Sequence, residues 1–169
     1  APQLQWVSTS ARTDVSFQTL CTTAWVQGRQ FMFYEGIVCF EYNNVTKIFD
    51  NITLTGLIVT DIVGIVTSNG YLLAWDIYGS LYWSNASDPL DFTPSLVTGA
   101  GSAAVNDVKG KIIACLPTRN GFIIYATENC VGATFSSNLR FPFNFKEVPG
   151  AGGIIDIEHV TYEANLDYH

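Results

Sequence analysis

The sequence has few charged residues for its length. Asp, Glu, Lys and Arg together make up 14% of the 169 residues, while hydrophobic residues make up 48%. Soluble domains usually carry about 25% charged residues. This shortage predicts that neighbouring chains cover part of the surface. A surface that is polar but uncharged, rich in Ser, Thr and Asn, is the alternative explanation.

Positive charge is the scarcer sign. The chain has eight Lys and Arg against fifteen Asp and Glu, a formal net charge of −7, and no run of basic residues. Tight binding to a phosphate backbone needs several Lys or Arg contacts. The composition therefore argues against sequence-reading nucleic-acid binding. An acidic surface would repel DNA, which would be useful in a conduit.

Cysteine pairs at metal or redox spacing are also lacking. Cys21, Cys39, Cys115 and Cys130 stand far apart and form no C-x-x-C motif, which argues against a zinc knuckle or a dithiol site. A chain of this size and apolar content can fold without disulfides. We expect all four thiols to be free in a reducing cytoplasm, with a secreted disulfide framework as the alternative.

Long hydrophobic runs are missing too. The longest apolar stretch, Leu57 to Val66, is interrupted by Thr60 and Asp61, whereas a membrane helix takes about 20 residues. We therefore expect no direct membrane insertion. No signal peptide opens the chain, and the first residue is Ala1 instead of Met, so we expect upstream residues to have been removed or to lie outside this sequence.

Short apolar runs are abundant. Runs of four to eight residues rich in Val, Ile, Tyr, Phe and Trp alternate with Gly, Asn, Asp and Ser, and helical periodicity is absent. This pattern predicts an all-β protein. Its clearest signal is Asn69-Gly70, a pair typical of a type I′ turn, which predicts a hairpin of 62–67 with 71–75. A third strand is expected at 81–83.

The hairpin pattern repeats about 51 residues later. In this alignment Asn120 and Gly121 fall opposite Asn69 and Gly70. The glycine-rich segments Gly99 to Ser102 and Gly150 to Gly153 match at the same offset, and we interpret them as turns between repeats. Trp83-Ser84 best matches Phe135-Ser136, and a weaker upstream copy spans Phe31 to Phe40.

A period near 50 residues with three or four strands is typical of propeller blades. We expect residues 1–169 to form one β-propeller-like domain or fragment of about three antiparallel blades, with approximate repeats 11–59, 60–110 and 111–161. A closed propeller needs about four blades or more, so we expect the chain to be part of a larger propeller. A β-sandwich with a coincidental internal repeat is the alternative.

Catalytic and cofactor sites are not predicted. His159 and His169 have no Cys or His partner at ligand spacing. Asp88 and Asp91 could form the carboxylate pair of a glycosidase, but Asp and Pro are also ordinary turn formers. No G-x-S-x-G or P-loop motif occurs. We therefore assign no catalytic, cofactor-binding or metal-binding residue and expect the chain not to be an enzyme.

Two surface features leave an extracellular role open. Asn-x-Ser/Thr sequons occur at Asn44, Asn51 and Asn85. Aromatic residues that could stack on sugar rings are Trp75, Tyr78, Tyr82, Trp83 and Phe92. Alternating aromatics in a β-protein more often belong to the core or to cross-strand pairs. About two sequons are expected by chance from the composition.

One segment resembles a known family. An apolar strand ending in Trp83-Ser84, a short polar loop, and Asp88-Pro-Leu-Asp91-Phe92 are similar to a segment in virion proteins of short-tailed bacteriophages, namely the tail nozzle (tail tubular) proteins and the packaged-DNA stabilisation proteins. The resemblance covers residues 60–169. The second copy, Phe135 to Phe145, lacks the Asp-Pro pair.

The resemblance implies a structural role in the virion tail, in a protein made in the host bacterial cytoplasm. Such a nozzle is a homo-oligomeric ring of about six copies attached to the head-to-tail adapter or portal-side proteins and to other tail proteins. DNA passes through its lumen without sequence-specific binding, and the ring retains the packaged genome. The alternatives are an extracellular carbohydrate-binding or glycosidase-like propeller and an intracellular propeller scaffold for protein–protein docking.

Overall fold

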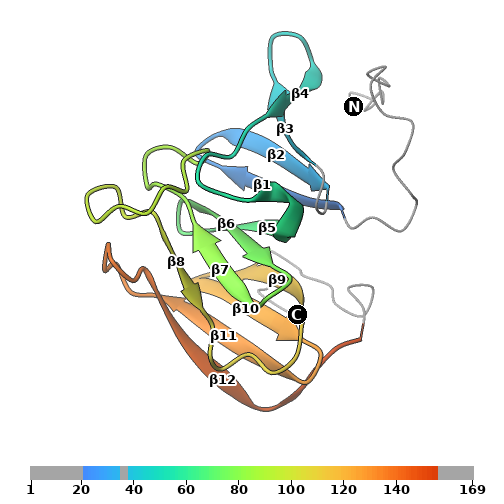
Figure 1. Ribbon diagram of the computed structural model, residues 1–169, viewed down its shortest axis with the longest axis vertical. Helices are drawn as coiled ribbons and strands as arrows, with labels where there is room; N and C mark the ends of the chain where they lie inside the picture. The colour runs from blue at the N-terminus through green and yellow to red at the C-terminus, as the bar shows by residue number, and fades with distance from the viewer. Residues whose placement is uncertain (1–20, 35–37, 156–169) are drawn as a thin grey trace.

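The computed structural model describes residues 21–34 and 38–155, and these residues form β-sheets (Figure 1). The predicted all-β fold is confirmed. Twelve strands form three four-stranded antiparallel sheets, and the described residues contain no α-helix. One short 3-10 turn, Val59–Asp61, precedes the second sheet.

Each sheet is a simple meander in which consecutive strands pair. The first contains β1 (Cys21–Val26), β2 (Arg29–Tyr34), β3 (Val38–Asn43) and β4 (Ile48–Ile52). The second contains β5 (Ile62–Ser68), β6 (Tyr71–Asp76), β7 (Ser80–Trp83) and β8 (Gly101–Ala104). The third contains β9 (Ile112–Thr118), β10 (Gly121–Ala126), β11 (Asn129–Phe135) and β12 (Phe143–Gly152). One sheet thus lies within each of the three predicted repeat ranges.

Two-residue turns open the first two sheets. The hairpin predicted around Asn69-Gly70 is confirmed: Ser68 pairs with Tyr71, and the turn residues have φ of 50° and 86°. The first sheet uses Gln27-Gly28 in the same way, with φ of 52° and 76°. Positive φ at both positions gives a twist that suits the flanking strands.

The third sheet corrects the predicted alignment of the repeats. Thr118 pairs with Gly121, so the turn residues are Arg119 and Asn120, and Gly121 is the first residue of β10. Cys115 then pairs with Ile124. In the second sheet the corresponding pair, Ile65 with Ala74, lies 50 residues earlier. The two hairpins are therefore related by 50 residues and not by the predicted 51.

This one-residue difference decides which face each side chain occupies. Leu72 and Ala74 of β6 pack toward the first sheet, whereas Leu73 and Trp75 pack toward the third. Phe122 of β10 packs toward the second sheet, as Leu72 packs toward the first. A slip of one residue exchanges the two faces of a strand. The predicted offset of 51 residues therefore matched side chains of the second sheet with side chains that lie on the opposite face of the third sheet.

The glycine-rich segments also differ from the prediction. Gly101 begins β8 and pairs with Trp83, while Gly152 ends β12 and pairs with Asn129. Only part of each segment lies between strands, because Gly99 and Gly153 are outside them. A Cβ atom at Gly101 would lie only 2.9 Å from the Trp83 ring and would collide with it. The glycine thus lets the Trp83 ring lie flat on β8.

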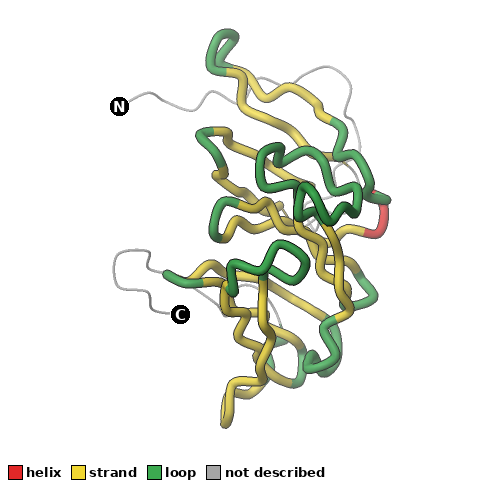
Figure 2. Tube along the Cα trace, turned by 90° about the vertical axis from the view of Figure 1, so that its left-hand side faces the viewer, coloured by secondary structure: helices red, strands yellow, loops and turns green. Residues whose placement is uncertain are grey.

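The three sheets are stacked along the long axis of the molecule (Figure 2), and the strand labels show that they follow one another in sequence order (Figure 1). One apolar cluster fills the space between the first and second sheets, and another fills the space between the second and third. Contacts between neighbouring sheets are concentrated on their first strands, β1, β5 and β9. This is how the inner strands of propeller blades meet, and it differs from a two-sheet sandwich. Closure into a complete propeller stays a prediction.

Candidate functional site

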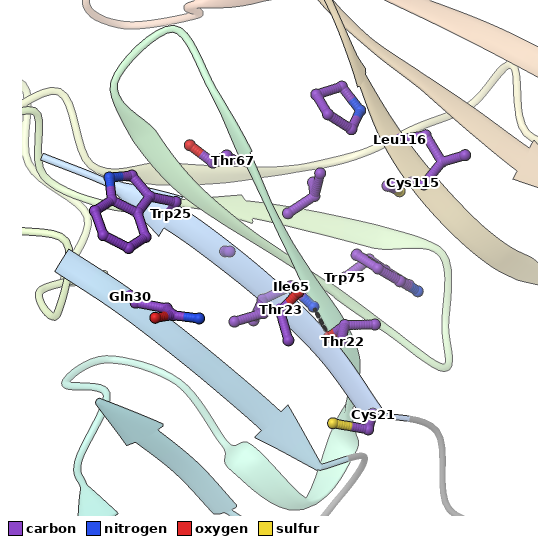
Figure 3. Close-up of a pocket in the computed structure, with 13 residues that line it drawn as sticks. Cys21, Thr22, Thr23, Trp25, Gln30, Ile65, Thr67, Trp75, Cys115 and Leu116 are labelled. Carbon is purple, nitrogen blue, oxygen red and sulfur yellow. Dashed lines mark hydrogen bonds between the residues drawn. The ribbon is translucent and has the colours of Figure 1, made fainter. Parts of the chain in front are cut away.

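A groove runs along the first strands of the three sheets (Figure 3). Its volume is about 320 Å³, near the lower end of small-molecule sites. Thr22 from β1, Thr67 from β5 and Leu116 from β9 all line it. Trp25 stands at its edge with 61% of its surface exposed. We call this the axial groove.

Among the described residues, those that line the axial groove carry no charge. Thr22 Oγ1 accepts a hydrogen bond of 2.8 Å from Ile65 N, so this hydroxyl joins the first strands of two sheets. Cys21 and Cys115 also line the groove. Burial raises the pKa of both thiols above the ordinary value. A thiol with a raised pKa is a poor nucleophile at neutral pH.

A second region is the long connection between β7 and β8. Its polar side chains bind the nearby backbone: Asn85 Oδ1 accepts from Ser87 N at 2.8 Å, and Asp88 Oδ1 accepts from Leu90 N at 3.0 Å. Asp91 Oδ1 accepts from Thr93 N at 2.9 Å, and this bond lowers the pKa of the Asp91 carboxyl. Both carboxylates are thus occupied as turn formers.

The end of this turn binds the segment that connects the first sheet to the second. Phe92 N donates to Thr55 O and Thr55 N donates to Leu90 O, each at 2.8 Å. The ring of Phe92 is buried in the cluster between the two sheets. A Cβ on Gly56 would lie 2.7 Å from Thr93 N, so glycine permits this close approach of backbones. We call residues 84–92 the interlock.

Polar side chains of the first sheet complete the interlock. Gln27 Nε2 donates to Gly70 O at 3.1 Å and to Ala86 O at 2.9 Å. Arg29 forms a two-pronged ion pair with Glu41, at 2.6 and 2.7 Å, and lies 3.7 Å from Asp88. The bonds to Glu41 raise the pKa of the Arg29 guanidinium. The turn of one sheet is therefore bound to the loop of the next.

The Trp-Ser pair anchors the other side of the interlock. Trp83 Nε1 donates to Gly99 O at 2.7 Å, and Ser84 Oγ accepts from Leu72 N at 3.1 Å. The aromatic residues that the sequence suggested for sugar binding differ in how deeply they are buried. Trp75, Trp83 and Phe92 are core residues, Tyr82 donates to Asp76 at 2.9 Å, and Tyr78 is exposed. None of the three buried rings can stack on a sugar.

A third region lies where the β7–β8 connection meets the loop between β11 and β12. A groove of about 280 Å³ is lined by Leu96, Leu139 and Phe141. These three side chains and the neighbouring Val97 are each more than half exposed. The guanidinium of Arg140 lies over the Phe141 ring, 5.5 Å from its centroid. Contiguous exposed apolar side chains of this kind mark interaction surfaces.

Sequence reasoning missed this third region. The signal was present, because Leu96-Val97 and Leu139-Arg140-Phe141 put large apolar residues into segments that otherwise contain turn formers. It also missed the Arg29–Glu41 pair, whose partners lie on different strands. Neither set forms a motif with a fixed spacing.

The remaining residues considered from the sequence are the two histidines and the four cysteines. His159 and His169 lie outside the described residues. All four cysteines are free in the structure. Over residues 21–34 and 38–155, no group of three or more His, Cys, Asp or Glu is arranged to hold a metal ion. Within the same residues no helix is long and apolar enough to cross a membrane.

No protein-family model matches the chain. A search of curated proteins finds no match either.

Proposed function

We propose that this chain is a structural subunit of the tail of a short-tailed bacteriophage, in a nozzle that surrounds the path of the DNA and retains the packaged genome. The observation that carries the proposal is the role of the segment from Trp83 to Phe92, where the family resemblance is strongest. Its side chains bind backbone groups or enter the core between two sheets. The segment therefore has a structural role, which is to connect neighbouring sheets.

The size of the axial groove bears on where DNA would pass. A volume of about 320 Å³ suits a small molecule and is far too small for a duplex. The first strands also contact one another and are joined by the Thr22–Ile65 hydrogen bond. In the proposed nozzle, DNA therefore runs through a lumen between copies of the chain and not between its blades.

The charge of the chain suits a conduit. With eight Lys and Arg and a net charge of −7, a subunit offers few contacts to phosphates. Two of the basic side chains, Arg29 and Lys109, are engaged by Glu41 and Glu147. A wall that binds phosphates weakly lets DNA slide past it.

The test is the mass and shape of the native particle, measured by analytical ultracentrifugation and by direct imaging. A ring with a central lumen, or recovery of the chain in a phage tail, supports the proposal. A monomer at all concentrations, with no incorporation into virions, refutes it. Retention of duplex DNA by the isolated chain at physiological salt would contradict the sliding role.

One observation favours the carbohydrate-binding alternative. The exposed Trp25 ring stands beside Gln30, its cross-strand partner, at the edge of the axial groove. An aromatic face with amide and hydroxyl groups nearby can hold a sugar ring. Glycan-array binding that is lost in Trp25→Ala but kept in Tyr78→Ala, another exposed aromatic, would establish this second function.

A further inference from the structure

Two groups of exposed apolar side chains lie at opposite ends of the blades. The first is the loop-end patch, which consists of Leu96, Val97, Leu139 and Phe141. The second is the linker-end patch, which consists of Ile58, Ile77 and Tyr78. Each of these seven side chains is more than half exposed. Groups of exposed apolar side chains commonly mark surfaces that contact another molecule.

The strand β6 separates the two ends. It starts at the Asn69-Gly70 turn, which Gln27 ties to the β7–β8 connection at the loop end. It ends at Asp76, directly before Ile77 at the linker end. Six extended residues span about 20 Å. The two patches therefore lie at opposite ends of β6, about 20 Å apart.

The linker-end patch is held together by backbone hydrogen bonds. Asp61 N donates to Ile58 O at 3.0 Å, and Ile77 N donates to Asp61 O at 3.1 Å. Tyr78 N donates to the Asp76 carboxylate at 2.8 Å. These bonds place the two isoleucines on either side of Asp61. The backbone of the patch is thus fixed around Asp61, the acidic residue in the chain between Ile58 and Ile77.

The two patches carry opposite charges. Arg140 lies within the loop-end patch, with its guanidinium over the ring of Phe141. Asp61 lies within the linker-end patch, where the Thr60 hydroxyl is its hydrogen-bond donor. Neither Arg140 nor Asp61 takes part in an ion pair among the described residues. Complementary charges within complementary apolar surfaces favour one patch as the partner of the other.

We infer that the loop-end patch of one copy binds the linker-end patch of a second copy, with Arg140 facing Asp61 across the contact. Such a contact joins different surfaces of identical chains, so it leaves one patch free on each side of a pair and can repeat. Repeated contacts of this kind close into a ring or extend into a filament. The inference deepens the proposed function, and it rests on that function for the expectation of a ring.

The test uses two variants that each spoil one patch of the full chain. Leu139→Asp puts a carboxylate into the loop-end patch, and Tyr78→Asp puts one into the linker-end patch. Each variant alone should be monomeric at concentrations where the wild type assembles. Mixed in equal amounts, they should form a dimer, because each supplies the patch that the other lacks. Val45→Asp, at an exposed position in the turn between β3 and β4, is the matched control and should assemble normally.

Charge exchange provides a second readout. Arg140→Glu and Asp61→Lys should each weaken assembly, and the chain carrying both substitutions should recover it. Wild-type melting temperatures will show that the single variants are folded.

The outcomes separate this inference from the proposed function. If the wild type forms a ring and the patch variants form the same ring, the inference is overturned and the nozzle proposal stands. The same holds if the mixture of the two variants stays monomeric. A wild type that is monomeric throughout would overturn both.

Discussion

The interlock makes a quantitative prediction about Phe92. Its side chain is 1% exposed and lies between the first and second sheets, whereas Phe141 is 51% exposed on the loop-end patch. Replacing a buried Phe by Ala costs about 3–5 kcal/mol, because the transfer free energy is lost and a cavity remains. The same change at an exposed site costs about 0.5 kcal/mol or less.

Domains are stable by about 5–15 kcal/mol, so Phe92→Ala should remove a large share of the free energy of unfolding. With a urea dependence of about 2 kcal/mol per molar, the midpoint should fall by about 2 M. Phe141→Ala, with the same change in size, should move it by about 0.3 M or less when measured at a protein concentration where the chain is monomeric. Equilibrium unfolding followed by tryptophan fluorescence measures both. If Phe92→Ala leaves too little folded protein, Phe92→Leu should show a smaller shift in the same direction.

The location of the effect is as important as its size. Phe92 contributes to the cluster between the first and second sheets and not to the cluster between the second and third. Phe92→Ala should therefore accelerate amide hydrogen exchange in β1 and β2 more than in β10 and β11. Equal midpoints for the Phe92 and Phe141 variants, or a uniform increase in exchange, would refute the interlock.

Three further predictions concern glycine, acid stability and thiols. A Cβ on Gly121 would overlap the carbonyl oxygen of Ala133, whereas one on Gly70 meets open space at a positive φ, so Gly121→Ala should lower the melting temperature far more than Gly70→Ala. Equal losses would contradict the observed register. Because the pKa of Asp91 is lowered in the folded state, its contribution to stability is present above about pH 4 and is lost as the pH falls through the folded pKa. Asp91→Asn should flatten this acid limb of the stability curve measured by thermal unfolding, and an unchanged limb would argue against the turn bond. Of the four cysteines, Cys21 alone is exposed, so one thiol per native chain should react with a thiol reagent, and all four should react after denaturation. Two or more fast-reacting native thiols would show that the core opens.

The local structure followed from local chemistry. Asn69-Gly70 predicted a hairpin because few residue pairs tolerate positive φ at two successive positions. Asp88 and Asp91 were interpreted as turn formers because short carboxylates bind backbone amides two residues on, and both do so here. These features depend on a few neighbouring residues, so the sequence contains all that is needed to predict them.

The alignment of the third sheet on the second did not follow. Strand β6 is buried along its whole length, so its apolar run has no alternation that would show which face each residue occupies. Asn120-Gly121 looked like a second Asn-Gly turn, but Gly121 lies inside β10, paired with Thr134 of β11 and close to the carbonyl oxygen of Ala133. Tertiary contacts decided the position of this turn, because the strand beside it needed a residue without a side chain.

The sequence by itself determined the class of fold and the Asn69-Gly70 hairpin, because each depends on composition or on turn residues close in the chain. Only the tertiary structure decided that Phe92 would meet Thr55, that Gln27 would bind Ala86, and that Leu96 would lie beside Leu139. These partners are separated by tens of residues. Their contacts follow from the stacking of complete sheets, whose burial of apolar surface outweighs any preference within a single segment.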